Sequence, residues 1–401
     1  MLGKQKVRNL GKVYEYLQDA DLRIKEVGRQ RITIRDVIFS GEAFNDQWGY
    51  YDFVDCEFAG QYKIRLGWLV NCTFTNCTFK DYVIFGNAKN VRFINCTVTT
   101  KGLGGVNFSS STGLVFEACK FSNSNFDRDN VGSVLSEGEI SFLGCRVKGF
   151  VLGGYKKLTL RNCITDNGEL NTASPGEYDD ESQMPYSDFL LEDCDFTRGV
   201  EMENAELNSF TMRNCKLSVF EPFYPVIRDF ALIEGIREGN IDLSSCSVHG
   251  KLTVRNCSFL KPHDGHNFWC PGIRAKYTLI ENVVCGSHPV NIMGLPIKMT
   301  EEKRLPMTLN KSFIIRDCDI PHLHVDWAQT EYLRIENCTI DTLLIRNGRI
   351  GKLEIIGCRL KKLDVSNTQV QEQDVRVQEG GKISGLITVT TGSNIKLLPR
   401  K

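Results

Sequence analysis

Three consecutive carboxylates, Asp179, Asp180 and Glu181, are the first residues whose type and spacing could do chemistry. Neighbouring carboxylates can bind calcium, or they can separate their pKa values and act as a general acid and a general base. The triplet stands in "TDNGELNTASPGEYDDESQMPYSD" at 165–188, a stretch rich in turn-forming residues. The competing interpretation is therefore a solvated acidic loop.

A second group of candidates lies in "KPHDGHNFWCPGIRAK" at 261–276. It consists of His263, Asp264, His266, Cys270, Arg274 and Lys276. The first four carry the atoms of a metal site, but their spacing matches no zinc signature, so we expect no metal and no cofactor. We expect the two cations to contact solvent or a carboxylate. The chain has no phosphate loop, no GxSxG elbow and no serine–histidine pair that would indicate a known catalytic set.

The composition excludes several classes of partner. Lys and Arg total 49, as do Asp and Glu, so the formal net charge is zero and no global field attracts nucleic acid or an anionic membrane. The same balance argues against mimicry of DNA, which needs a strongly acidic surface. The N-terminal "MLGKQKVRNLGKVYEYLQ" lacks the apolar run of a signal peptide. No stretch approaches the roughly 18 apolar residues of a membrane span.

The chain contains 16 cysteines, and most of them share one local context. Disulfide frameworks belong to small secreted chains, and this chain is neither small nor visibly secreted. We therefore expect most of the thiols to be reduced and buried as small apolar groups. Free thiols favour a cytoplasmic protein of bacterial or phage origin, with delivery by a signal-independent secretion route as the alternative.

One motif recurs through almost the whole chain. It reads apolar, any, apolar, two mostly polar residues, cysteine, any, apolar. Copies include "YDFVDCEF" at 51–58, "VRFINCTV" at 91–98, "LTVRNCSF" at 252–259 and "LRIENCTI" at 333–340. Fixed-period similarity is typical of solenoids, so we expect one elongated domain rather than several globular ones.

The clearest copies lie between Glu331 and Val370, where apolar residues recur at every fifth position. Alternation on either side of the polar pair is the period of a β-strand with one buried face. Asn337 is expected at a corner, because asparagine tolerates the left-handed conformation. Four five-residue faces make a coil of twenty, which would stack Cys338 on Cys358. The sequence therefore predicts an all-β fold, a single-stranded right-handed parallel β-helix.

Two families resemble this pattern. The strings "NCTF" and "VRFINCTV" resemble the pectin-lyase-like right-handed β-helices, whose coils turn at a stacked asparagine. The five-residue beat of 331–370 resembles the pentapeptide-repeat proteins, whose coils are square. Coil lengths vary in the first two thirds of the chain, which favours the pectin-lyase-like description there. Both motifs are architectural, so neither resemblance implies one activity.

A more local resemblance concerns activity. "HDGHN" followed by Arg274 and Lys276 resembles the histidine and Arg-x-Lys elements of β-helix polygalacturonases. The aspartate motifs that those enzymes carry upstream are absent from this sequence. Four tryptophans are further candidates, because tryptophan can stack on sugar rings or pack at a core margin: Trp48, Trp68, Trp269 and Trp327.

The expected domain organisation follows from the repeats. Residues 1–30 form an N-terminal cap, with a helix over 7–18, because a solenoid must cover its exposed edge. The β-helix spans 31–390, and 391–401 is a tail. Insertions are expected near 165–188, 220–240, 261–276 and 288–307, and the second contains "IRDFALIEGI", which we interpret as a short helix.

The missing catalytic set favours a non-enzymatic role. We expect a β-helix scaffold that recognises another macromolecule, a protein, through its loops and lateral faces. The alternative is a carbohydrate-active enzyme of pectin-lyase-like fold, a polysaccharide lyase or glycoside hydrolase, with polysaccharide as its partner.

Overall fold

The computed structural model describes the chain in twenty segments and divides it into two compact units, Met1–Thr197 and Arg198–Lys401. The described residues are 5–7, 31–39, 43–85, 88–99, 106–108, 111–122, 139–148, 150–152, 156–165, 168–171, 187–196, 200–203, 206–223, 225–237, 239–243, 246–260, 268–271, 274–293, 310–377 and 388–389.

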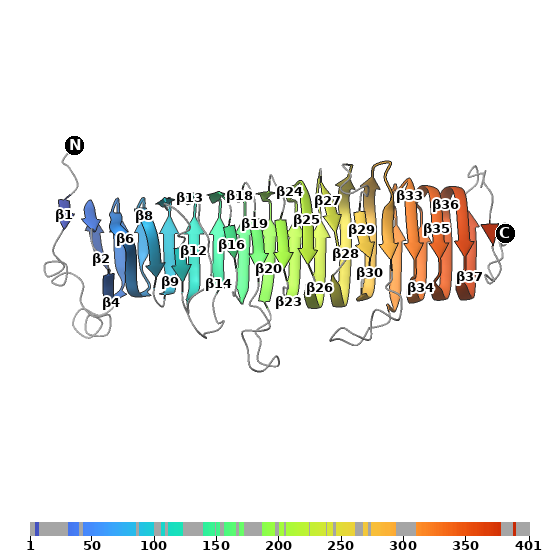
Figure 1. Ribbon diagram of the computed structural model, residues 1–401, viewed down its shortest axis with the longest axis horizontal. Helices are drawn as coiled ribbons and strands as arrows, with labels where there is room; N and C mark the ends of the chain where they lie inside the picture. The colour runs from blue at the N-terminus through green and yellow to red at the C-terminus, as the bar shows by residue number, and fades with distance from the viewer. Residues whose placement is uncertain are drawn as a thin grey trace. The chain divides into compact units, whose positions relative to one another are not determined.

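The first unit, unit 1, contains strands only in its described part (Figure 1). They are β1 (Gln5–Val7), β2 (Ile32–Arg35), β3 (Val37–Phe39), β4 (Ala43–Gly49), β5 (Tyr51–Val54), β6 (Glu57–Val70), β7 (Thr73–Thr75), β8 (Thr78–Phe85), β9 (Ala88–Ile94), β10 (Thr97–Thr99), β11 (Val106–Phe108), β12 (Thr112–Glu117), β13 (Lys120–Ser122), β14 (Glu139–Leu143), β15 (Arg146–Lys148), β16 (Phe150–Leu152), β17 (Lys157–Arg161), β18 (Ile164–Thr165), β19 (Gly168–Asn171), β20 (Ser187–Glu192) and β21 (Asp195–Phe196).

The second unit, unit 2, is built in the same way. Its strands are β22 (Val200–Glu203), β23 (Glu206–Arg213), β24 (Lys216–Leu217), β25 (Val219–Phe223), β26 (Val226–Glu234), β27 (Asn240–Asp242), β28 (Ser247–Phe259), β29 (Phe268–Pro271), β30 (Arg274–Cys285), β31 (Val290–Met293), β32 (Ser312–Arg316), β33 (His322–Asp326), β34 (Gln329–Glu336), β35 (Thr339–Arg346), β36 (Arg349–Ser366), β37 (Gln369–Val377) and β38 (Thr388–Val389).

Parallel pairing between successive coils holds each unit together. In unit 1, Phe53 pairs with Phe74, and Phe74 with Phe93 on the next coil. In unit 2, Leu333 pairs with Leu353, twenty residues on. The prediction of an all-β, right-handed parallel β-helix is confirmed, and the twenty-residue coil is confirmed in the C-terminal part of the chain.

The corners of the coils are made by residues in the left-handed conformation. Asn337 has φ 53° and Gly357, its equivalent one coil later, has φ 64°. Most of the left-handed residues are asparagine, aspartate or glycine, which adopt this conformation at lower cost than other residues. Amide side chains also bond from coil to coil: Asn95 Nδ2 donates to Asn76 Oδ1 at 2.8 Å. The predicted asparagine corner is confirmed.

Aromatic rings fill the core of unit 1 in two stacks. Successive rings of the first stack lie 4.6–5.0 Å apart between centroids, and this stack comprises Phe53, Phe74, Phe93, Phe116 and Phe142. In the second, Phe58 lies 4.8 Å from Phe39 and 4.9 Å from Phe79. The two stacks meet edge to face, so the offset and T-shaped geometries that aromatic pairs favour are both satisfied.

In the C-terminal coils, the apolar side chains that recur at every fifth position point into the core. Leu333 and Ile335 are buried, as are Cys338 and Ile340 five positions later, each at most 1 % exposed. Left-handed corners recur every ten residues, at Trp327, Asn337, Asn347, Gly357 and Asn367. Only every second five-residue boundary therefore uses the left-handed conformation.

Two expectations on helices fared differently. The "IRDFALIEGI" helix is wrong, because β26 covers Val226–Glu234 and pairs in register with β28. Ile227 and Ala231 are four residues apart, as on one face of a helix, because β26 has one extra residue between them. Arg228 and Asp229 lie opposite a single residue of β23. Segment 220–240 is thus mostly scaffold. The cap helix at 7–18 lies outside the described residues beyond Val7, which ends β1.

Candidate functional site

Most of the candidate residues taken from the sequence lie outside the described part of the chain. Asp179, Asp180 and Glu181 fall in the undescribed 172–186, and His263, Asp264 and His266 in 261–267. Cys270 lies in β29 and Arg274 opens β30, but their side chains are not described. Lys276 is described: its ammonium lies 5.7 Å from the centroid of the Tyr277 ring. The proposed roles of these residues remain predictions.

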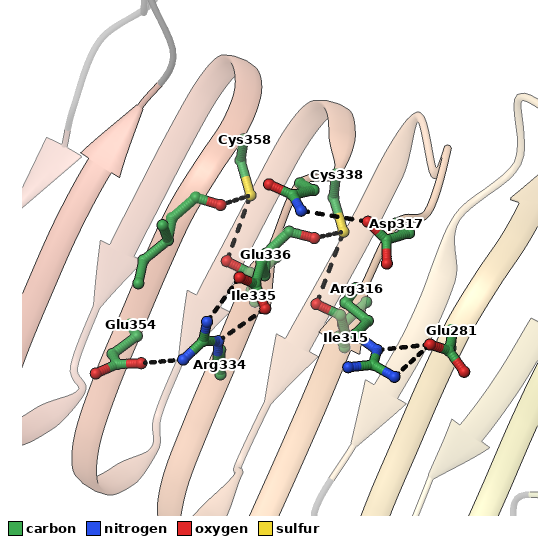
Figure 2. A network of polar contacts seen from close by, with 12 residues as sticks. Glu281, Ile315, Arg316, Asp317, Arg334, Ile335, Glu336, Cys338, Glu354 and Cys358 are labelled. Carbon is green, nitrogen blue, oxygen red and sulfur yellow. Dashed lines mark hydrogen bonds and ion pairs between the residues drawn. The ribbon is translucent and has the colours of Figure 1, made fainter.

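The outward face of one sheet of unit 2 carries a row of charges that alternate in sign from coil to coil. The members of this charge ladder are Arg213, Glu234, Arg255, Glu281 and Arg316. Glu234 accepts from Arg213 at 3.0 Å and lies 2.8 Å from Arg255 Nε. Arg316 Nε donates to Glu281 at 2.7 Å (Figure 2). Each charge of the ladder has a neighbour of opposite sign, so the ladder fixes register rather than presenting a reactive group.

Further along this face, in Figure 2, Arg334 joins two carboxylates. Its guanidinium lies 2.6 Å from Glu336 and 3.1 Å from Glu354. Lys352 and the Tyr332 hydroxyl bond to Glu354, and these contacts hold the pKa of Glu354 below its usual range. A carboxylate with three such partners is stabilised in its charged form and is a poor general acid.

A different part of unit 2 carries a group of cations and aromatic rings. We call Phe230, Lys251, Lys276, Tyr277 and Lys311 the binding edge. Phe230 pairs with Lys251, which pairs with Tyr277, and the amide of Lys311 donates to the Lys276 carbonyl at 2.8 Å. Phe230 is 43 % exposed and Tyr277 42 %.

The bulge in β26 explains why the binding edge projects. β26 and β28 each carry one residue more at this corner than β23 and β30. Gly250 fits there because a Cβ would lie 1.7 Å from the Asp229 carbonyl oxygen. The lysines of the edge have no ion-pair partner among the described residues, although like charges on neighbouring strands repel.

A group that sequence reasoning missed lies on the outward face of β33, β35 and β36. We call His324, Asp326, Arg346 and Asp364 the acid group. Arg346 pairs with Asp326 in register, and its Nη2 donates to Asp364 Oδ2 at 2.7 Å. Asp364 is 9 % exposed. Asp326 Oδ1, Arg346 Nε and Asp364 Oδ1 are buried without a hydrogen-bond partner.

The two carboxyls of the acid group have different charged neighbours. Burial raises the pKa of Asp326, and Asp364 adds to this, while Arg346 and His324 oppose it. Asp364 has the direct arginine partner that Asp326 lacks. The two strands that carry them lie two coils apart, about 10 Å.

Trp327 extends the acid group along the coil. It follows Asp326 directly, has φ 57° and is 40 % exposed. Trp68 is 50 % exposed in unit 1, whereas Trp48 is fully buried in the core. The twenty-residue beat was the signal that could have found this group, since it aligns 324, 344 and 364 on one face.

Neither a metal site nor a membrane helix emerges from the described residues. No group of three or more His, Cys, Asp or Glu side chains in the described segments is placed to hold a metal ion. No helix there has the length and apolar composition of a membrane span.

Comparison with known proteins identifies the architecture. Residues 53–221 match the family model described as right handed beta helix region. Neither the comparison with curated proteins nor that with solved structures returned a match. The family match is consistent with the pectin-lyase-like resemblance of the sequence, and the parallel coils of unit 2 show the same fold outside the matched segment. The chain is a right-handed parallel β-helix.

Proposed function

We propose that this chain is a non-enzymatic β-helix that recognises another protein through the binding edge and the adjoining loops. The observation that carries the proposal is the contrast between the two edges of the same strands. On β26, β28 and β30 the ladder residues Glu234, Arg255 and Glu281 each have a partner of opposite charge. Closer to the N-terminal ends of these strands, and just before β32, Lys251, Lys276 and Lys311 lie beside two exposed aromatic rings.

Exposed aromatic residues such as Phe230 and Tyr277 are the usual anchors of a recognition surface. The charge of the edge favours an acidic partner, since complementary potentials speed association and suppress wrong partners. The predicted insertion 261–276 contains Lys276, and 288–307 leads to Lys311. The two predicted insertions therefore adjoin, in the sequence, the lysines of the binding edge.

The experiment is affinity capture from a lysate of the source organism, followed by mass spectrometry. The test variant combines Lys251→Glu, Lys276→Glu and Lys311→Glu. The matched control is Lys362→Glu, an exposed lysine on β36 away from the edge. We expect one or a few acidic proteins bound by the natural chain and by the control, and lost with the triple variant. Equal capture by all three chains would refute the role of the edge.

A second candidate function, a carbohydrate-active enzyme, is favoured by one observation. The acid group pairs a carboxyl of raised pKa, Asp326, with an arginine-bound carboxylate, Asp364, beside the exposed Trp327. Glycoside hydrolysis uses two carboxyl groups, and the general acid of the pair has a raised pKa. The test is release of reducing ends or of unsaturated products from a polysaccharide panel. Activity that disappears in both Asp326→Asn and Asp364→Asn would support it; inactivity of the natural chain on every polymer would remove its basis.

A further inference from the structure

The binding edge forms a line across successive coils of unit 2. Phe230 on β26 pairs with Lys251 on β28, and Lys251 pairs with Tyr277 on β30. These three strands lie side by side (Figure 1). Lys276 precedes Tyr277, and Lys311 follows one coil later, where its amide bonds to the Lys276 carbonyl. Each step along the line is the spacing of parallel strands, about 4.8 Å.

The two rings of the line limit the shape of a partner more than the lysines do. Register places Phe230 and Tyr277 on the same outward face, two coils or about 9.6 Å apart. Both side chains are exposed. An aromatic side chain rotates about only two torsions, whereas the long stem of a lysine is flexible. A partner that covers both rings must therefore place two apolar groups at this separation.

An α-helix fits this spacing. One stripe of a helix carries positions i, i+4 and i+7, with about 5.4 Å per turn and about 10.5 Å from i to i+7. Those distances are close to one coil and two coils of the β-helix. The stripe therefore faces Phe230, Lys251 and Tyr277 with three successive side chains of its own.

Extended forms of a partner fit this line less well. A β-strand repeats the side chains of one face every ~6.8 Å, which matches neither one coil nor two. A polyproline II helix returns to the same face after three residues, about 9.3 Å, and this spacing covers both rings. Its two intermediate residues point to other faces, so none of its side chains lies opposite Lys251.

The charge of the binding edge indicates which residues the helix presents between its apolar positions. Lys251, Lys276 and Lys311 place three cations on three successive coils. Asp229 on β26 and Glu331 on β34 bound this stretch, so the cations occupy its middle. Complementary charges speed association and disfavour wrong partners, so acidic side chains are expected opposite the lysines.

We propose that the binding edge holds an acidic amphipathic α-helix of the partner protein, lying across the coils of unit 2. Apolar residues at i and i+7 pack on Phe230 and Tyr277. An acidic residue at i+4 faces Lys251, and a second at i+11 faces Lys311, one coil beyond Tyr277. The inference rests on the proposed function, since it names the element of the partner that this surface binds.

The test uses four labelled synthetic peptides of about 20 residues, a length at which alanine-rich peptides are helical. The first, the helix peptide, carries Leu at i and i+7 and Glu at i+4 and i+11. The second, the permuted peptide, has the same composition with leucine and glutamate on opposite faces. The third alternates Leu and Glu, and the fourth is proline-rich with Leu at every third position.

Fluorescence anisotropy with the natural full-length chain at low salt gives the four dissociation constants. Circular dichroism of each free peptide checks its conformation. We expect the helix peptide to bind at least about tenfold more tightly than each of the others.

Charge reversal locates the peptide on the binding edge. The triple variant Lys251→Glu, Lys276→Glu and Lys311→Glu should lose the helix peptide and bind a copy in which the glutamates are replaced by lysine. Rescue of this kind shows that the variant is folded. Tyr277→Ala removes one ring and should weaken binding of the helix peptide about tenfold. Trp68→Ala is the matched control, because Trp68 is 50 % exposed on unit 1 and its loss should change nothing.

Several outcomes would overturn the inference. They are no binding of the helix peptide up to about 1 mM, equal affinity for the helix and permuted peptides, tighter binding of the alternating or proline-rich peptide, and tighter binding of a single-stranded oligonucleotide. Should Tyr277→Ala fail to fold, Phe230→Ala removes the other ring and is judged by the same loss of affinity.

The proposed function fails by a different result, equal capture from the lysate by the natural chain and the triple variant. Capture that is lost in the triple variant, without any preference for the helix peptide, refutes the helical partner alone.

Discussion

At the scale of single residues, the corner decides which side chain the next position accepts. After a left-handed residue the following side chain turns inward beside two backbone carbonyls. Cys338 Sγ lies 3.2 Å from the Glu336 oxygen, and Thr368 Oγ1 donates to the Ser366 oxygen at 3.1 Å. A small side chain with a weak donor fits this position, which explains why cysteine recurs there. Burial raises the pKa of the isolated Cys72 thiol to about 11, so it stays protonated at neutral pH.

Inward and outward positions should differ sharply in their tolerance of charge. Ile355 is fully buried, so Ile355→Asp places a carboxylate in the core without a partner. We expect a loss of several kcal/mol and local unfolding of the coils. Thr339→Asp, on the exposed face, should change stability by less than about 0.5 kcal/mol. Urea unfolding of the two variants provides the comparison, and equally mild effects would contradict the inward assignment.

The left-handed corner makes a second prediction at this scale. Asn337→Ala keeps a Cβ at φ 53° and loses the bond from Nδ2 to Asp317 Oδ1 at 3.3 Å. It should destabilise the chain by about 1–2 kcal/mol. Asn337→Gly also loses the bond but removes the steric conflict, as Gly357 does one coil later, so it should cost less. If alanine proved the milder change in thermal unfolding, backbone conformation would not be the reason for asparagine at the corner.

At the scale of elements, register between coils is set by side chains on both faces of a strand. The core alone would accept more than one alignment of similar apolar residues. The charge ladder removes this freedom, since a slipped strand would bring like charges together. The binding edge differs from the ladder, because the alignment of the strands brings its lysines near other lysines and not near opposite charges.

The charge ladder should make a small, pH-dependent contribution. Its arginines, Arg255 first, lower the pKa of Glu234 below its usual 4.5. A depressed folded pKa means that the stabilisation is present above about pH 4.5 and is lost as the pH falls through the lower, folded value. Glu234→Gln should therefore cost up to about 1 kcal/mol at pH 7 and progressively less in acid.

The control for this prediction is Glu139→Gln. Glu139 lies 3.9 Å from Lys157 and its side chain is 58 % exposed, so its removal should have no measurable effect at any pH. The measurement is the urea midpoint of each chain at several pH values. A difference between Glu234→Gln and the natural chain that grew in acid would show that the sign of the coupling is wrong.

At the scale of the whole molecule, repeated coils leave function to the positions that break the repeat. Buried side chains are accounted for by packing, whereas the segments between strands vary in length. Phe116 pairs with Phe142 across 26 residues, and Glu281 bonds Arg316 across 35. Segments that vary in this way within a regular scaffold are where recognition is usually placed.

Replacing 172–186 or 261–267 with a short Gly-Ser turn tests this division of labour. The strands set these limits, because β19 ends at Asn171 and β29 begins at Phe268. Loop-closure entropy changes slowly with length, so circular dichroism and the melting temperature should stay nearly unchanged. At least one of the two deletion variants should fail to capture the partner that the natural chain captures. Two folded variants with full binding would place the working surface on the coils alone.

The sequence by itself determined the strands, the corners and the inward positions of this protein. These features depend on residues within about twenty positions of one another, and "LRIENCTI" at 333–340 already contains both an alternation and a corner. The helix expected in "IRDFALIEGI" was wrong because a bulge, visible only in the pairing of β26 with its neighbours, gave strand residues a helical spacing. The candidate site could be predicted from the sequence to a smaller extent than the fold.

Only the tertiary structure decided which outward residues become neighbours. Lys251, Lys276 and Lys311 are 25 and 35 positions apart, so no fixed period along the chain aligns them. Coils of unequal length shift the residue that faces a given position, so sequence distance no longer indicates spatial distance. Backbone pairing between coils restores the alignment, and that pairing is a property of the folded chain.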